Sequence, residues 1–265
     1  MASRKEQKEQ ARARRLAEER AATERARRER RLRMILGAVL GAVAIVAVLI
    51  AVSSNGGGAG ATGLQKGKAA TKTATAVQTL LAGLPQSGAR LGNPKAPVTM
   101  TYYGDLECPI CRDFTLNGGF SQLVSNDVRA GKVQVVYRAF ETATQDPSVF
   151  KTQQVAALAA GAQQKFWDFI ELFYHEQGPE GTGYVTSSYL SGLAQQITGL
   201  SLSQWQSAQG DAAFANQVAA DGQMGTSAGV SGTPTLVFQG PKGKTSPSSS
   251  VPSYGQLQQA IKQVS

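Results

Sequence analysis

The stretch Cys108-Pro109-Ile110-Cys111 decides the fold, because it holds the only two cysteines among 265 residues and separates two different sequence patterns. Before it, alternating apolar residues from Val98 predict a strand that ends near Tyr103. After it, apolar residues at helical spacing predict a helix. We therefore expect Cys108 to be exposed at a helix N-terminus, with Cys111 shielded. At such an end, unpaired N–H groups and the helix dipole lower the pKa of a thiol from about 8.5 toward roughly 3.5–7.5.

The spacing of the two cysteines favours redox chemistry over other uses. One helical turn brings the two sulfurs within disulfide distance, and Pro109 suits that turn because its missing N–H costs nothing there. A zinc site needs about four ligands, and His175 is the only further thiol or imidazole donor, so the sequence argues against a metal. A purely structural disulfide is the stronger alternative, but so short a loop gains little stability from closure.

The formal net charge of +9 is concentrated at the N-terminus. Residues 1–33 contain 13 Lys or Arg against 6 Glu, and the rest of the chain contains 14 basic against 12 acidic residues. The larger part is thus nearly neutral and has no basic stripe interleaved with aromatic residues. The sequence therefore argues against nucleic-acid binding.

Residues Met34–Val52 are 19 consecutive uncharged, mainly apolar residues, enough to cross a membrane as a helix. Arginines crowd the N-terminal side of this run, so the positive-inside rule predicts a cytoplasmic, basic, helical segment 1–33 and an extracytoplasmic remainder. A cleaved signal peptide with a site at Ala59-Gly60-Ala61 is the alternative. Both the basic start and the apolar run exceed the usual lengths of signal peptides, so a retained single-pass anchor is the preferred interpretation.

Residues 53–78 contain almost no large apolar side chains and predict a flexible linker. The folded domain is expected over 79–265. Its predicted strands are 98–103, 133–140 and 235–239, and the first two form a parallel crossover. Helical patterns cover 148–178 with a break near Gly161, then 186–197 and 204–224, which makes a helical insertion over about 148–226. Ser253 and Gln256 form a capping-box pattern before a last helix.

A proline stands at the start of the late strand, in Ser231-Gly232-Thr233-Pro234. Proline cannot donate to a β-ladder, so this position suits it, and such turns are where cis X-Pro bonds occur. In combination with the dithiol, we predict a cis Thr233–Pro234 bond. It would leave the Thr233 backbone free to pair with an extended peptide.

Together, these residues resemble the thioredoxin fold in its bacterial DsbA-like form, an α/β fold with a helical insertion. The resemblance covers about residues 79–265. It implies a thiol–disulfide oxidoreductase that acts on unfolded or reduced secreted proteins, without a cofactor, and is reoxidised by a quinone-linked membrane partner. By motif match, Cys108 would be the attacking sulfur and Cys111 the resolving one, with Thr233-Pro234 facing them. Many such proteins also have an N-terminal membrane anchor.

Two positions depart from the pattern of this family. Ile110 stands where strong oxidants of the family often have histidine, so the potential is expected to be less oxidising. Tyr102 stands six positions before Cys108, where many relatives carry an acidic residue. Asp105 and Glu107 are nearby carboxylates, and we expect them to be exposed and merely solvated.

The sequence leaves the direction of exchange open. A strongly stabilised Cys108 thiolate makes the protein an oxidant that introduces disulfides, and a weakly stabilised one makes it a reductase or isomerase. A membrane-tethered peptide-binding chaperone or scaffold with an inert disulfide is the alternative from another class. We assign no chemistry to His175, a predicted surface residue, and expect Trp167 and Trp205 in the core.

Overall fold

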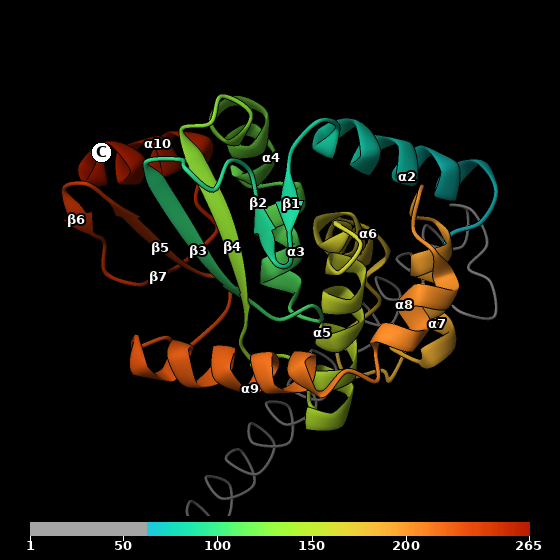
Figure 1. The fold of residues 1–265 in the computed structure, drawn as a ribbon. Coiled ribbons are helices and arrows are strands. Elements are labelled where there is room, and N and C mark those ends of the chain that lie inside the picture. The colour runs from blue at the N-terminus through green and yellow to red at the C-terminus, as the bar shows by residue number, and fades with distance from the viewer. Residues whose placement is uncertain (1–62) are drawn as a thin grey trace, which may run out of the picture. The chain divides into compact units, whose positions relative to one another are not determined.

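A computed structural model describes residues 63–265 of the chain (Figure 1). The predicted basic segment 1–33, the predicted span 34–52 and residues 53–62 of the predicted linker lie outside these residues. Within 63–265, no helix has both the length and the apolar character needed to span a bilayer.

The centre of the fold is a mixed sheet. β3 (Val98–Gly104) pairs in parallel with β4 (Val133–Ala139) and antiparallel with β5 (Thr235–Gly240). The parallel pairing of the first two predicted strands is thus confirmed. Four further strands of two residues each extend the sheet: β1 (Gln86–Ser87), β2 (Arg90–Leu91), β6 (Gly243–Lys244) and β7 (Ser248–Ser249). The strand order is β1-β2-β4-β3-β5-β6, and β7 also pairs with β5.

The alternation that predicted β3 has a direct counterpart in burial. Val98, Met100 and Tyr102 are at most 1% exposed and face the main hydrophobic core. Tyr103 points to the other face of the sheet, where it joins a small cluster with Val230 and Val237. As a central strand between β4 and β5, β3 is therefore covered on both faces at its C-terminal end.

Five helices follow β4 and precede β5, in the range expected for the helical insertion. In Figure 1 they occupy the right half of the molecule, except that α9 runs beneath the sheet. The predicted break near Gly161 is present, but the predicted helix 204–224 is two helices, because Asp211 caps a new one by accepting a hydrogen bond from the N–H of Ala213. The five are α5 (Pro147–Gly161), α6 (Phe166–Glu176), α7 (Ser187–Gln195), α8 (Leu202–Ala208) and α9 (Ala212–Ser227).

The prediction of a flexible linker over 53–78 is wrong for residues 68–78, because they belong to helix α2 (Lys68–Leu81). The helix buries Val77 and Leu81 and packs against α6. Leu64, just before it, is 4% exposed and lies against Gly192 of α7. Few apolar side chains are thus enough to fix this segment, because the helical insertion offers a complementary surface.

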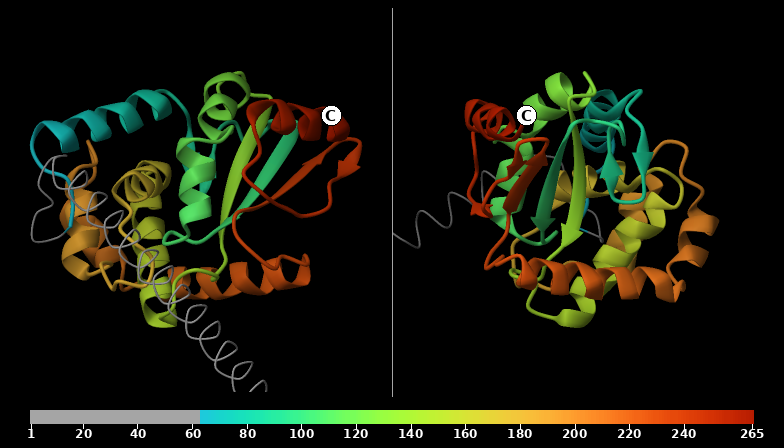
Figure 2. Two further views of the ribbon diagram at one scale, coloured as in Figure 1. Left: turned by 180° about the vertical axis from the view of Figure 1, so that it is seen from behind. Right: turned by 60° about the vertical axis from the view of Figure 1, so that its left-hand side comes forward.

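The helix after the cysteines is shorter than its apolar spacing suggested. α3 (Pro109–Leu116) is followed by α4 (Phe120–Leu123) and a π-helical turn, η1 (Val124–Val128). The break falls at Gly118-Gly119, where a Cβ on Gly119 would overlap the backbone of Ser253 and Tyr254. There the last helix, α10 (Tyr254–Val264), begins with the predicted capping box, and it lies along the sheet beside β5 (Figure 2).

Candidate active site

Cys108 lies where the chain leaves β3 and turns into α3. It is the N-cap residue of α3, with φ −70° and ψ 117°, and Pro109 occupies the first turn. A turn closed by the hydrogen bond from the Cys108 N–H to the Asp105 carbonyl (3.1 Å) precedes the helix. The predicted strand–dithiol–helix arrangement is therefore present, and Cys108 stands at the positive end of a helix.

Both cysteines are free thiols, and their surroundings separate their acidities. The Cys108 sulfur accepts a hydrogen bond from the N–H of Cys111 at 3.3 Å. The pKa of Cys108 is lowered to about 6, most strongly by the side chain of Cys111. The Thr233 side chain and the backbone N–H groups of Cys111 and Ile110 lower it further, whereas burial acts in the opposite direction. Burial raises the pKa of Cys111 well above its ordinary value. At neutral pH, Cys108 is mostly thiolate and Cys111 is protonated.

The expectation that Cys108 is exposed is wrong, since the residue is only 4% exposed. The Thr233 loop covers it, and the Cys108 thiol lies 3.3 Å from the Thr233 carbonyl, to which it can donate. Cys111, as predicted, is fully buried. Ile110, between them, is 49% exposed and presents an apolar surface beside the sulfur.

The Thr233–Pro234 peptide bond is cis, as predicted, and it lies opposite the dithiol. Two strands bring these segments together, because the C-terminal end of β3 pairs with the start of β5 through Tyr103 and Thr235. The Thr233 hydroxyl also contacts the hydroxyl of Thr142, in the loop after β4. Three segments that are distant in sequence thus meet at Cys108.

The prediction that Asp105 and Glu107 are exposed is wrong. Asp105 is fully buried and Glu107 is 5% exposed. The Asp105 carboxylate accepts hydrogen bonds from the backbone N–H groups of residues 107 and 142–144 and from the Thr144 hydroxyl, at 2.6–3.1 Å. It therefore ties the segment before Cys108 to the loop that carries Thr142. Burial raises the pKa of Glu107.

Tyr102 lies in the core below Cys111. Its hydroxyl is 3.4 Å from the Cys111 carbonyl and donates to the Tyr174 hydroxyl at 3.2 Å. Burial raises the pKa of Tyr102 well above that of a free phenol, so this position holds a neutral polar group under the dithiol. Trp167 and Trp205 are core residues, as predicted, and His175, predicted at the surface, is half-buried there.

One residue that contacts the motif was not predicted from the sequence. Gln177, at the end of α6, donates its side-chain amide to the carbonyls of Leu106 (2.6 Å) and Cys108 (3.1 Å). Nothing local in the sequence marks this glutamine, because its partners are 69 and 71 residues away.

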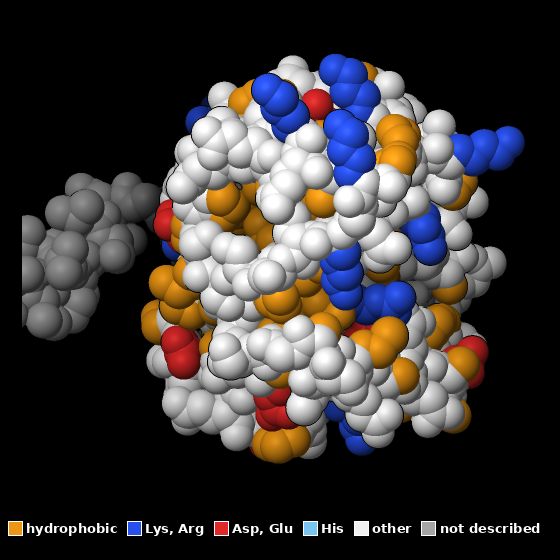
Figure 3. Space-filling model, turned by 90° about the vertical axis from the view of Figure 1, so that its left-hand side faces the viewer, with side chains coloured by type: hydrophobic (Ala, Val, Ile, Leu, Met, Phe, Trp, Pro, Cys, Tyr) orange, Lys and Arg blue, Asp and Glu red, His pale blue; other side chains and the backbone are white. Residues whose placement is uncertain are grey.

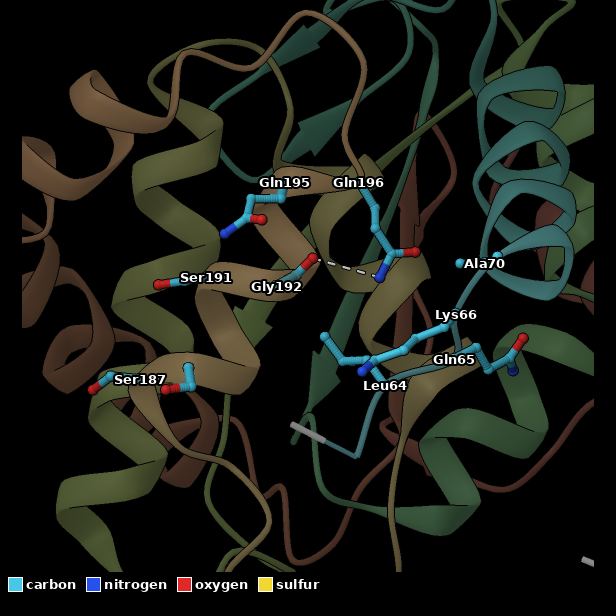
Figure 4. A pocket seen from close by; sticks show the side chains of 11 residues that line it. Leu64, Gln65, Lys66, Ala70, Ser187, Ser191, Gly192, Gln195 and Gln196 are labelled. Atoms are coloured by element: carbon cyan, nitrogen blue, oxygen red, sulfur yellow. Dashed lines mark hydrogen bonds between the residues drawn. The ribbon is translucent and has the colours of Figure 1, made fainter. Parts of the chain in front are cut away.

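Two hollows lie away from the cysteines. One, of about 650 Å³, separates residues 64–67 and α2 from α7, and polar side chains such as Ser191 and Gln195 line it (Figure 4). The other, of about 410 Å³, lies between β5, residues 245–252 and α10, on the side seen in Figure 3, where apolar side chains lie at the bottom of the hollows. Neither includes Cys108, Cys111, Thr233 or Pro234. Among residues 63–265, no group of three acidic, His or Cys side chains is arranged to hold a metal ion.

The central sheet, a dithiol at a helix start and a facing cis-proline define a thioredoxin-fold protein. The family model described as thioredoxin matches residues 86–263, so the chain belongs to the thioredoxin family.

Within this family, the chain is similar to the disulfide bond formation protein D of Bacillus subtilis (strain 168), with 28% identity over 156 residues. The match covers 55% of this chain and 65% of that relative, slightly less than two thirds of its length. Among solved structures, oxidised BdbD from Bacillus subtilis has a TM-score of 0.56 at 21% identity, over 69% of this chain and 96% of that one. Pseudomonas aeruginosa DsbA2 has a TM-score of 0.54 at 23% identity, over 68% and 95%. These structures share the fold.

Proposed function

We propose that this protein is an extracytoplasmic thiol–disulfide oxidoreductase that introduces disulfides into secreted or envelope proteins. The observation that carries the proposal is the geometry of the dithiol: Cys108 caps the N-terminus of α3, its sulfur accepts the Cys111 N–H, and the cis Thr233–Pro234 bond lies opposite. These surroundings lower the pKa of Cys108 to about 6, whereas burial raises that of Cys111. Such a pair favours the reduced protein, which makes the disulfide form an oxidant. The similarity to a disulfide bond formation protein supports the same activity.

In the proposed reaction, the protein starts with a Cys108–Cys111 disulfide. A client thiolate attacks the Cys108 sulfur, the disulfide breaks, and Cys111 leaves as a thiolate and takes up a proton. A second client thiolate then attacks the client sulfur of the mixed disulfide and releases Cys108 as a thiolate. The client loses two electrons and gains one disulfide, and the protein gains the two electrons. The low pKa of Cys108 favours the second step, because a more acidic thiol is the better leaving group.

Ile110 and the Thr233–Pro234 loop are the proposed contact surface for the client. Ile110 offers exposed apolar area next to Cys108, and the Thr233 backbone lies at hydrogen-bonding distance from the sulfur. An extended peptide that pairs with this backbone would bring its own cysteine to Cys108.

The proposed location is the outer side of the cell membrane, with Met34–Val52 as a single-pass anchor and residues 1–33 in the cytoplasm. The charge asymmetry around the apolar run supports this topology. An oxidising compartment also allows the Cys108–Cys111 disulfide to persist. For reoxidation we propose a quinone-linked membrane thiol oxidase, as the resemblance to DsbA-like proteins implies.

The test is oxidation of a reduced, unfolded protein by the oxidised enzyme. We expect the full chain to form disulfides in the test protein stoichiometrically and Cys108→Ser to form none. Cys111→Ser, given a test protein that already contains a disulfide, should accumulate mixed disulfides: its Cys108 thiolate attacks the client disulfide, one client sulfur leaves as a thiolate, and no second thiol of the variant releases Cys108. If Cys108→Ser oxidises the test protein as fast as the unaltered chain, the activity does not reside at this site, and a scaffold with an inert disulfide is the better account.

A further inference from the structure

The carbonyl groups on either side of Glu107 are held by one side chain from the helical insertion. The Gln177 amide nitrogen donates to the Leu106 carbonyl at 2.6 Å and to the Cys108 carbonyl at 3.1 Å. The second carbonyl belongs to the N-cap residue whose sulfur performs the proposed chemistry. It also accepts the N–H of Arg112, the first hydrogen bond of α3.

Gln177 is itself fixed at the end of α6. The preceding residue, Glu176, accepts a hydrogen bond from the Tyr189 hydroxyl at its carbonyl (3.0 Å) and from the Gln65 N–H at its carboxylate (2.8 Å). One turn earlier, the Arg112 side chain of α3 donates to the Tyr174 carbonyl at 3.0 Å. The end of α6 is therefore attached to α3, to α7 and to the segment before α2.

We propose that Gln177 is a positioning residue for dithiol exchange: its amide fixes the backbone of residues 106–108, so that the Cys108 sulfur stays at the N–H of Cys111 and opposite Thr233. The proposal rests on the proposed function, because it concerns the sulfur that exchanges. The two hydrogen bonds to neighbouring carbonyls act as a two-point clamp. Without it, the turn from Asp105 to Cys108 keeps its own hydrogen bond and the 3.4 Å hydrogen bond from the Tyr174 hydroxyl of α6 to the Asp105 carbonyl, but the carbonyls of Leu106 and Cys108 lose their link to the helical insertion.

The charged or titratable groups near this clamp come from three segments. Arg112 lies on α3, Glu107 lies between the two clamped carbonyls, and His175 and Glu176 lie on α6. An effect of Gln177 must therefore be separated from a change in these charges. A substitution without charge, Gln177→Met, has nearly the same length and removes the side-chain amide, and with it both hydrogen bonds to the Leu106 and Cys108 carbonyls. Gln177→Glu keeps the shape but puts a carboxylate against two carbonyl oxygens.

The experiment measures the alkylation rate of Cys108 against pH in the full chain, with Cys111 protonated and slow to react. We expect Gln177→Met to raise the apparent pKa of Cys108 by about 0.5–1, as for the loss of one or two hydrogen bonds, so that below this pKa alkylation slows about three- to tenfold. Gln177→Glu should raise it further. Both variants, in their disulfide forms, should also oxidise a reduced test protein much more slowly than the unaltered chain does.

The matched control is Gln163→Met. The Gln163 side chain also forms two hydrogen bonds, donating to the Ser201 carbonyl at 3.1 Å and accepting from the Ser201 N–H at 2.8 Å, between the end of α5 and the start of α8. It should lower the stability of the fold and leave the pH profile of Cys108 unchanged.

A purely structural role for Gln177 predicts a different result. In that case Gln177→Met lowers the free energy of unfolding but keeps the alkylation profile of the unaltered chain, and the proposal is wrong. If Gln177→Met does not fold, Gln177→Ala, which is also uncharged and lacks the side-chain amide, decides by the same comparison. Alkylation does not require exchange with a client, so the proposed oxidase activity can fail while this test still gives an answer.

Discussion

At the residue scale, the proposed exchange depends on how Cys108 is stabilised as a thiolate. The side chain of Cys111 makes the largest contribution to its low pKa. We therefore expect Cys111→Ala to raise the pKa of Cys108, leaving it below that of free cysteine, because the backbone N–H groups and Thr233 remain. Ultraviolet titration of the thiolate in this variant checks the expectation. An unchanged pKa would show that the helix end and Thr233 account for the acidity without the Cys111 side chain.

The same thiolate makes the stability of the reduced protein depend on pH. The folded pKa of Cys108 is about 6 and the ordinary value is 9.0, so its contribution to stability is fully present above pH 9 and is lost as the pH falls through 6. Its size is at most about 4 kcal/mol. Buried Glu171 acts in the opposite direction, because burial raises its pKa to about 8 and its contribution is lost as the pH rises.

The measurement is therefore a difference in unfolding free energy between the reduced protein and Cys108→Ser, by denaturant titration. The difference should grow in favour of the unaltered protein between pH 6 and 9. A constant difference over this range would contradict a stabilised thiolate.

At the element scale, Asp105 connects the segment before α3 to the loop after β4. We expect Asp105→Ala to leave several buried N–H donors unpaired and to cost about 2–4 kcal/mol of stability. The loop that carries Thr142 should also lose its fixed contact with Thr233. Denaturant unfolding gives the first quantity, and hydrogen exchange of residues 142–144 gives the second. Normal protection of these amides in the variant would show that another group holds the loop.

Helix α2 provides a second prediction at this scale. Leu81, 4% exposed, lies at the end of α2, the helix that packs against α6. Truncation to Ala should cost about 2–4 kcal/mol, the range for a buried leucine. The control is Leu80→Ala, on a less buried position of the same helix, which should cost clearly less. Equal, small effects would indicate that α2 contributes little to the fold.

These elements also show how far the sequence could predict the structure. Alternation in 98–103 and the apolar run 133–140 were sufficient to predict β3 and β4, because strand burial repeats every second residue. α2 was missed because it buries only two of its side chains fully, Val77 and Leu81, and depends on a surface supplied by α6. The break after Leu116 depends on the approach of α10 to Gly119, which no local pattern encodes.

For the site, the sequence predicted the dithiol at the helix start and the cis bond before Pro234, since both are local motifs. It could not predict that Asp105 is buried or that Gln177 contacts the motif. The hydrogen bonds that hold these two side chains in place join residues at least 37 positions apart in the sequence. The low exposure of Cys108 likewise follows from the Thr233 loop, which only the pairing of β3 with β5 brings to it.

At the scale of the whole molecule, the central claim is that the folded protein holds Cys108 as a thiolate beside a protonated Cys111. The reduction potential, measured against glutathione over a range of pH, tests it directly. Reduction takes up two protons below the pKa of Cys108 and one above it, so the potential should change by about 60 mV per pH unit below about pH 6 and by about 30 mV per unit above it. A straight line of about 60 mV per unit up to pH 9 would contradict the account, since it would mean that Cys108 is no more acidic than a free cysteine.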